Sequence, residues 1–179
     1  MKNLLHINEF AKIKENKFIV YHGSLKEFDI FDYQFLGTGN GTDQHGPGFY
    51  FSSDPEDAKV SKKKKKYEIT INKELSKITK PKIGEIEKLI RIAPDHEDTL
   101  TKFGETYHQG FREAVKLMIT DNNYDTMMNI WADFYMRQKQ SIQFVKNLVN
   151  LKYDGTIIPM RYGVTHYVMY DINKISLLP

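Results

Sequence analysis

Cysteine is absent from the sequence, which excludes disulfide bridges, a thiolate nucleophile and every metal site with cysteine ligands. Long apolar runs are absent too, because the longest, at residues 18–21 and 155–160, fall far short of the roughly 20 residues that cross a bilayer. The first ten residues contain no apolar stretch of secretory length and no small-residue cleavage site. We therefore expect no membrane association and a cytoplasmic location.

A strong excess of charge of one sign is also missing, since the sequence contains 26 basic and 23 acidic residues and its formal net charge is +3. This balance gives little support to nucleic-acid binding. The basic residues are clustered, however, because five consecutive lysines run from Lys62 to Lys66. Such a run is typical of a solvated loop, and a nucleic-acid site is the less favoured interpretation.

The length of the chain indicates a single domain. Its 179 residues suffice for one sizeable core and are too few for two domains of ordinary size. We predict one domain over residues 1–179, with strands in residues 18–81, a helical segment in residues 82–150 and further strands in residues 151–179. This order predicts an α+β fold in which both ends of the chain form the sheet.

Strands are predicted where β-branched and aromatic residues cluster or alternate with polar ones. The predicted strands are residues 18–22, 48–52, 67–71, 155–159 and 165–170. In the third of them, apolar residues alternate with polar ones, which predicts a single buried face.

Helices are predicted in the middle of the chain, where apolar residues recur at three- and four-residue spacing. The predicted helices are centred on residues 83–90, 111–118 and 142–149. Their shared seam is predicted to contain Trp131, Phe134 and Tyr135. Residues 95–98 include three acids and a histidine, but acids favour a helix start, so we expect no metal there.

Two segments contain residues suited to holding a ligand. Tyr21-His22-Gly23-Ser24 stands at the end of a predicted strand, where a glycine lets the backbone approach a ligand closely. Residues 37–48 form a glycine-rich loop that leads into Phe49-Tyr50-Phe51-Ser52. The loop precedes a strand and lacks a Gly-Lys-Ser/Thr ending, so it is neither a Rossmann fingerprint nor a P-loop. Taken alone, the histidine is compatible with a structural role and the loop with a plain connection.

In combination, these segments resemble a known family. His-Gly-Ser at a strand end, then Gly-Phe-Tyr-Phe-Ser and an expected helix containing Glu56-Asp57-Ala58-Lys59, resemble the NAD-binding half of the diphtheria-toxin-like ADP-ribosyltransferases, which include the poly(ADP-ribose) polymerases. Residues 152–158 and 167–175 are similar to the closing segments of phage and polyvalent-protein members. The resemblance covers about residues 18–176. It implies a split β-sheet with an inserted helical segment.

The resemblance also implies roles for individual residues, with NAD as co-substrate and no metal. In such enzymes a histidine, here His22, hydrogen-bonds the adenosine ribose, and the next glycine, Gly23, holds the nicotinamide carboxamide through its backbone. Tyr50 matches the tyrosine that packs on the nicotinamide ring. The residues implied to bind NAD are Tyr21, His22, Gly23, Ser24, Gly48, Phe49, Tyr50 and Ser52. The implied catalytic residues are His22, Tyr50 and His166.

The sequence departs from the family at the position before Tyr167, where His166 replaces the usual glutamate, and no glutamate follows Glu113. A neutral imidazole can accept a hydrogen bond from a ribose hydroxyl, whereas a protonated one opposes the positive charge that develops as nicotinamide leaves. Asp154 and Asp171 are poor substitutes because they belong to turn and strand-end motifs. Poly(ADP-ribose) chain growth, which depends on the glutamate in this family, is not expected.

The resemblance therefore implies a mono-ADP-ribosyltransferase that modifies a host or rival protein as a bacterial or phage effector. An inactive relative that works as a binding module or inhibitor is one alternative, motivated by the absent glutamate. An NAD glycohydrolase is another. A nucleic-acid ADP-ribosyltransferase is the third, and the lysine run is its only local support. The sequence sets no expectation for the oligomeric state.

Overall fold

The computed structural model describes residues 16–25, 28–37, 45–58, 64–75, 82–93, 128–136 and 139–179. The predicted helix at residues 111–118, the acidic cluster at residues 95–98 and most of the glycine-rich loop, residues 38–44, lie outside these ranges.

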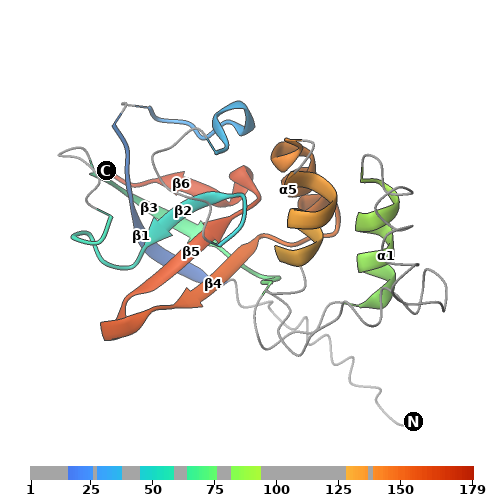
Figure 1. Ribbon diagram of the computed structural model, residues 1–179. Coiled ribbons are helices and arrows are strands. Elements are labelled where there is room, and N and C mark those ends of the chain that lie inside the picture. The colour runs from blue at the N-terminus through green and yellow to red at the C-terminus, as the bar shows by residue number, and fades with distance from the viewer. Residues whose placement is uncertain are drawn as a thin grey trace, which may run out of the picture.

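A six-stranded antiparallel sheet forms the centre of the molecule, with the strand order β4-β5-β2-β1-β3-β6. Its strands are β1 (Lys17–Gly23), β2 (Phe49–Ser52), β3 (Lys64–Thr70), β4 (Gly155–Pro159), β5 (Thr165–Met169) and β6 (Ile175–Leu177). Figure 1 shows the blue N-terminal strand among the red C-terminal ones, so both ends of the chain build the sheet. The predicted α+β fold is confirmed.

All five predicted strands are present, and the short β6 is an addition. Strand β3 begins at Lys64, so the prediction of a solvated loop is wrong for the last three lysines of the run. Each residue of β1 pairs with a residue of β3, and this long ladder outweighs the low strand propensity of lysine. The ammonium group of Lys65 lies 2.6 Å from the Asp29 carboxylate and 2.7 Å from the Phe28 carbonyl oxygen. Lys62 and Lys63 lie outside the described residues.

The sheet consists of two halves joined by a short seam. Within the described residues, β1 and β2 share a single registered pair, Tyr21 opposite Ser52, whereas β2 pairs with β5 along its whole length. One half is therefore β4-β5-β2 and the other is β1-β3-β6. This division agrees with the split sheet that the resemblance implies.

The helices lie to one side of the sheet. They are α1 (Ile83–Arg91), a π-helix (Trp131–Met136) and α5 (Ser141–Asn150), and in Figure 1 α5 lies between the sheet and α1. The predicted seam is confirmed, because Trp131, Phe134 and Tyr135 are all buried. The Tyr135 hydroxyl donates to the Leu89 carbonyl oxygen of α1 at 2.5 Å and accepts from the Asn147 amide of α5 at 3.0 Å. Burial raises the pKa of Tyr135 to about 12, so the phenol stays a donor.

A polar network fastens the helical segment to the sheet. The Asp154 carboxylate is buried and accepts backbone N–H groups of Asn72 at 2.8 Å and Lys73 at 3.1 Å. The Lys73 ammonium group contacts the Glu85 carboxylate of α1 at 2.8 Å, and the Tyr153 hydroxyl donates to the same carboxylate at 2.5 Å. The Tyr-Asp-Gly motif thus has a structural function here. None of the helices in the described part of the chain is long and apolar enough to cross a membrane.

Candidate active site

The predicted site residues lie where the two halves of the sheet meet, and they point to both faces. Neighbouring residues on a strand point to opposite faces. Tyr21 and Ser52 are registered partners, and Ser52 is also opposite His166, so these three residues share one face with Tyr50. We call this the Tyr50 face. The side chain of His22 lies on the other face.

His22 is half-buried in a cluster of aromatic rings. Its ring centroid lies 5.2 Å from that of Phe31 and 5.5 Å from that of Phe51. Its Nδ1 atom is 2.7 Å from the backbone carbonyl oxygen of Tyr50. A carbonyl oxygen can only accept, so Nδ1 carries the proton and Nε2 of the neutral ring has a free lone pair. Burial lowers the pKa of His22, although the bond to Tyr50 opposes this shift, and the ring is therefore neutral near pH 7.

Tyr50 is held by its hydroxyl group. The hydroxyl donates to the Gly46 carbonyl oxygen at 2.6 Å and accepts the His45 backbone N–H at 3.0 Å. Gly46 has φ +82°, a conformation that side chains disfavour, and a Cβ there would lie 2.7 Å from the Met128 sulfur. A glycine is thus required at position 46, where the loop backbone accepts the hydrogen bond from the Tyr50 hydroxyl.

His45 joins Tyr50 to His166. The ring of His45 stacks on that of Tyr50 at 6.3 Å with an interplanar angle of 27°, and it meets the ring of His166 edge-on at 5.9 Å. Burial lowers the pKa of His45, and the nearby His166 adds to this effect. Tyr50 of β2, His166 of β5 and His45 of the loop before β2 therefore form one aromatic cluster on the Tyr50 face.

Asp57 completes this cluster. Its Oδ2 atom lies 2.7 Å from Nε2 of His166, so a carboxylate stands beside the residue that the resemblance places at the position of the usual glutamate. We expected a helix over residues 56–59, but residues 55–58 form a turn, with a hydrogen bond of 3.1 Å from Ala58 N–H to the Asp54 carbonyl oxygen, and Lys59 lies outside the described residues. The Asp54 side chain caps this turn, because it accepts the Glu56 N–H at 2.8 Å. The turn places the Asp57 side chain next to His166 of β5.

The other residues predicted to bind NAD are packed in the sheet or lie at a strand end. Gly48 packs so tightly on β5 that a Cβ would overlap the Val168 side chain. Phe49 is buried against Phe31, with ring centroids 5.2 Å apart. Ser52 is buried and accepts the backbone N–H of Asp54 at 3.1 Å. Gly23 and Ser24 lie half-buried at the end of β1, beside the seam.

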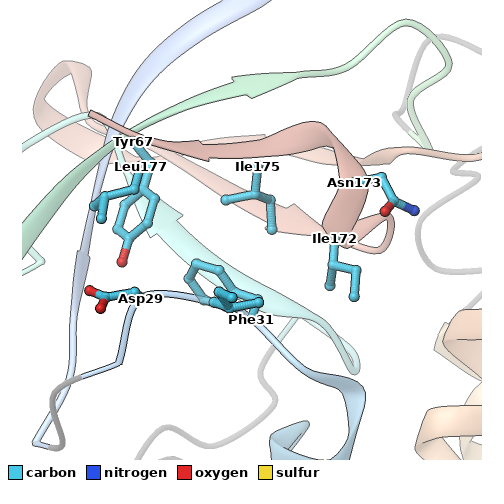
Figure 2. A pocket seen from close by; sticks show the side chains of 8 residues that line it. Asp29, Phe31, Tyr67, Ile172, Asn173, Ile175 and Leu177 are labelled. Carbon is cyan, nitrogen blue, oxygen red and sulfur yellow. The ribbon is translucent and has the colours of Figure 1, made fainter. Parts of the chain in front are cut away.

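A pocket of about 170 Å³ lies elsewhere, between residues 29–31 and strands β3 and β6. Figure 2 shows Ile172 and Ile175 lining it and the Tyr67 hydroxyl pointing toward Asp29. Burial, with the charge of Asp29, raises the pKa of Tyr67. The pocket contains none of the predicted site residues and is smaller than the roughly 300 Å³ at which small-molecule pockets begin. Among the described residues, no group of acidic and histidine side chains is arranged to hold a metal ion.

One comparison with known proteins identifies a family for the chain. A family model described as ADP-ribosyltransferase in polyvalent proteins matches residues 16–176. The chain belongs to this family. The match includes all of β1 to β5 and every predicted site residue. No curated protein and no solved structure gives a significant match to the chain.

Membership of this ADP-ribosyltransferase family connects the chain with ADP-ribosyl transfer, for which the family uses NAD. The resemblance in the sequence pointed to the same family through His22, Tyr50 and the closing Tyr-Val-Met-Tyr strand. It did not single out His45 or Asp57. His45 stands at the end of a glycine-rich sequence segment, and Asp57 is one acid among several, so only the folded chain shows that both meet His166.

Proposed function

We propose that the protein is an NAD-dependent mono-ADP-ribosyltransferase that modifies a protein target in the cytoplasm, as an effector of bacterial or phage origin. The observation that carries this proposal is the meeting of Tyr50, His45 and His166 on one sheet face. His22, whose side chain lies on the other face, is tied to the same strand by its contact with the Tyr50 carbonyl oxygen. Family membership supports the transfer of ADP-ribose.

Tyr50 supplies an aromatic surface for the nicotinamide ring. Its hydroxyl is engaged by both Gly46 and His45, so the ring is held in position before any ligand arrives. Preorganised stacking of this kind lowers the ordering cost of binding and favours one orientation of the nicotinamide. Gly23 ends β1 at the seam, where its backbone is available to the carboxamide.

The two strand histidines provide hydrogen-bond acceptors for ribose hydroxyls. The neutral ring of His22 offers Nε2, because Nδ1 donates to the Tyr50 carbonyl oxygen. In our proposal His22 holds the adenosine ribose and His166 holds the nicotinamide ribose, in place of the usual glutamate. A single transfer is expected without chain growth.

The charges of the site suit the reaction. Cleavage of the nicotinamide–ribose bond produces an oxocarbenium-like centre, so nearby positive charge is unfavourable and negative charge is favourable. Burial lowers the pKa values of both His22 and His45, which keeps these rings neutral. The Asp57 carboxylate adds a negative charge next to His166.

The test uses NAD labelled in its adenylate moiety, incubated with the purified protein with and without bacterial lysate. Release of nicotinamide together with label on one protein band supports the proposal. Tyr50→Ala should abolish both signals, and Tyr162→Ala, which removes a tyrosine whose side chain is 99% exposed, should leave them unchanged.

Other outcomes overturn the proposal in favour of specific alternatives. Free ADP-ribose without labelled protein identifies a glycohydrolase, and label on nucleic acid identifies a nucleic-acid transferase. NAD binding without nicotinamide release identifies a binding module, the alternative that His166 in place of glutamate favours.

A further inference from the structure

Within the part of the chain that the structure describes, the Asp57 side chain makes one hydrogen bond, and its partner is His166 of β5. The distance from Oδ2 to Nε2 is 2.7 Å, which lies within the usual range of charge-assisted hydrogen bonds. Asp57 comes from the turn at residues 55–58 and His166 from β5, so 109 residues separate them in sequence. The fold brings this carboxylate to the one position where the family's glutamate is missing.

The contact determines which nitrogen of His166 can accept a hydrogen bond. An ionised carboxylate can only accept, so Nε2 of His166 must carry the proton and donate it to Asp57. Nδ1 of the neutral ring then has the free lone pair. The hydrogen bond made by one ring nitrogen thus sets the role of the other.

The contact also changes the charge at this position. A neutral imidazole alone contributes no charge, whereas the pair of a neutral His166 and an ionised Asp57 has a net charge of −1. Protonation of the ring would leave the pair neutral and not positive. The pair therefore avoids the cationic site that an isolated, protonated histidine would create beside an oxocarbenium-like centre.

Stability is a weak explanation for the pair. The side chain of Asp57 is 40% exposed and that of His166 is 24% exposed. Ion pairs this accessible to water contribute little to folding, because solvent screens them. The neighbouring Glu56, on the same turn, is more exposed at 64% and pairs with Lys64 instead. Glu56 is therefore a matched control, since it is a carboxylate one residue away that does not touch His166.

We propose that Asp57 is a positioning residue that orients His166, so that Nδ1 of His166 accepts a hydrogen bond from a hydroxyl of the nicotinamide ribose. This inference rests on the proposed NAD site. It assigns to the Asp57–His166 pair the task of the absent glutamate, with the imidazole contacting the substrate and the carboxylate holding the imidazole.

The first test measures kcat and KM for NAD by nicotinamide release. Asp57→Ala should lower kcat/KM about tenfold or more, the size of effect seen when the carboxylate partner of a metal-bound histidine is removed. Asp57→Glu should recover part of the loss because it keeps a carboxylate, while Glu56→Gln should match the wild type. In a His166→Ala background, Asp57→Ala should cause no further loss, because the two residues act as one unit. Equal activity of Asp57→Ala and Glu56→Gln would overturn the inference, as would additive losses.

The second test does not need turnover. Nitrogen-15 NMR of the histidine rings, recorded at a pH at which the rings are neutral, should show Nε2 of His166 protonated and Nδ1 unprotonated in the wild type. Addition of carba-NAD, a non-hydrolysable analogue, should shift the Nδ1 signal, and this response should be lost in Asp57→Ala. A protonated Nδ1, or an Nδ1 signal whose chemical shift does not change when carba-NAD is added, would overturn the inference. Absence of nicotinamide release alone would instead refute the proposed transferase activity, so the two failures are distinguishable.

Discussion

His22 and Tyr50 are connected across the seam of the sheet, where Nδ1 of His22 lies 2.7 Å from the Tyr50 carbonyl oxygen. Within the described residues the two strands concerned share only one registered pair, so this side-chain contact supplements a short ladder. The same contact leaves Nε2 of His22 as an acceptor. One hydrogen bond thus serves both the joining of the two halves and the chemistry that we propose for the histidine.

Substitutions at His22 should separate these two functions. His22→Asn places an amide N–H near the position of Nδ1 and removes Nε2, so it should keep most of the stability and lose NAD turnover. His22→Ala leaves the Tyr50 carbonyl oxygen without its partner, which should lower the free energy of unfolding by about 1–3 kcal/mol. Urea denaturation and nicotinamide release measure the two effects. Equal stability of both variants would show that the seam does not depend on this bond.

Substitutions at Tyr50 should distinguish its ring from its hydroxyl. Tyr50→Ala removes the stacking surface, and the affinity for NAD should fall by about 1–3 kcal/mol, as for other base–aromatic contacts. Tyr50→Phe keeps the ring but loses the hydrogen bonds with Gly46 and His45, so a smaller loss is expected. Calorimetric titration with NAD measures both. A loss as large for Tyr50→Phe as for Tyr50→Ala would assign the binding energy to the hydroxyl and the loop it holds.

Two glycines should respond in opposite ways to replacement by alanine. Gly48→Ala forces a Cβ into the Val168 side chain, where β2 packs on β5, and should destabilise the fold by about 1–3 kcal/mol. Gly84 lies in α1 with open space around its Cα, so Gly84→Ala should stabilise the fold by about 0.5–1 kcal/mol. Thermal unfolding of the two variants and the wild type measures both changes in stability. A neutral Gly48→Ala would mean that β2 and β5 can separate without cost.

Asp154 should matter for stability rather than for catalysis. Its buried carboxylate accepts two backbone N–H groups from the segment after β3, so Asp154→Ala should cost about 2–3 kcal/mol of unfolding free energy. Asp171→Ala is the control, because Asp171 caps only a short turn through the Asn173 N–H and should cost about 1 kcal/mol or less. Denaturant titration compares the two. Nicotinamide release per folded molecule should be unchanged in Asp154→Ala, and a specific loss of kcat would give this residue a catalytic part.

Stability should decrease below about pH 6.5, the ordinary pKa of histidine. Burial lowers the pKa values of His22 and His45 in the folded protein, so the unfolded chain binds more protons between the lowered values and 6.5. Their contribution is fully present above pH 6.5 and is lost as the pH falls from there through the lowered values. Urea denaturation at several pH values measures the slope, which should be smaller in His22→Asn. An identical slope would mean that His22 titrates normally in the folded state.

The sequence predicted β1, β2, β4 and β5 because their aromatic and β-branched residues favour strands whatever they pair with. It did not predict Lys64 to Lys66 as strand, since lysine disfavours strands and only the ladder with β1 holds them there. The site divides in the same way. His22 and Tyr50 stand in local motifs, whereas the contact between Asp57 and His166 depends on a turn and a strand far apart in sequence.

The central claim is tested most directly by measuring nicotinamide released from NAD by the wild-type protein and by the single variants Tyr50→Ala and His166→Ala, with Tyr162→Ala as control. The account predicts release by the wild type and the control, and loss of release in both site variants while their folding is retained. Full release by Tyr50→Ala and His166→Ala would contradict the account, because the chemistry would then lie away from the Tyr50 face.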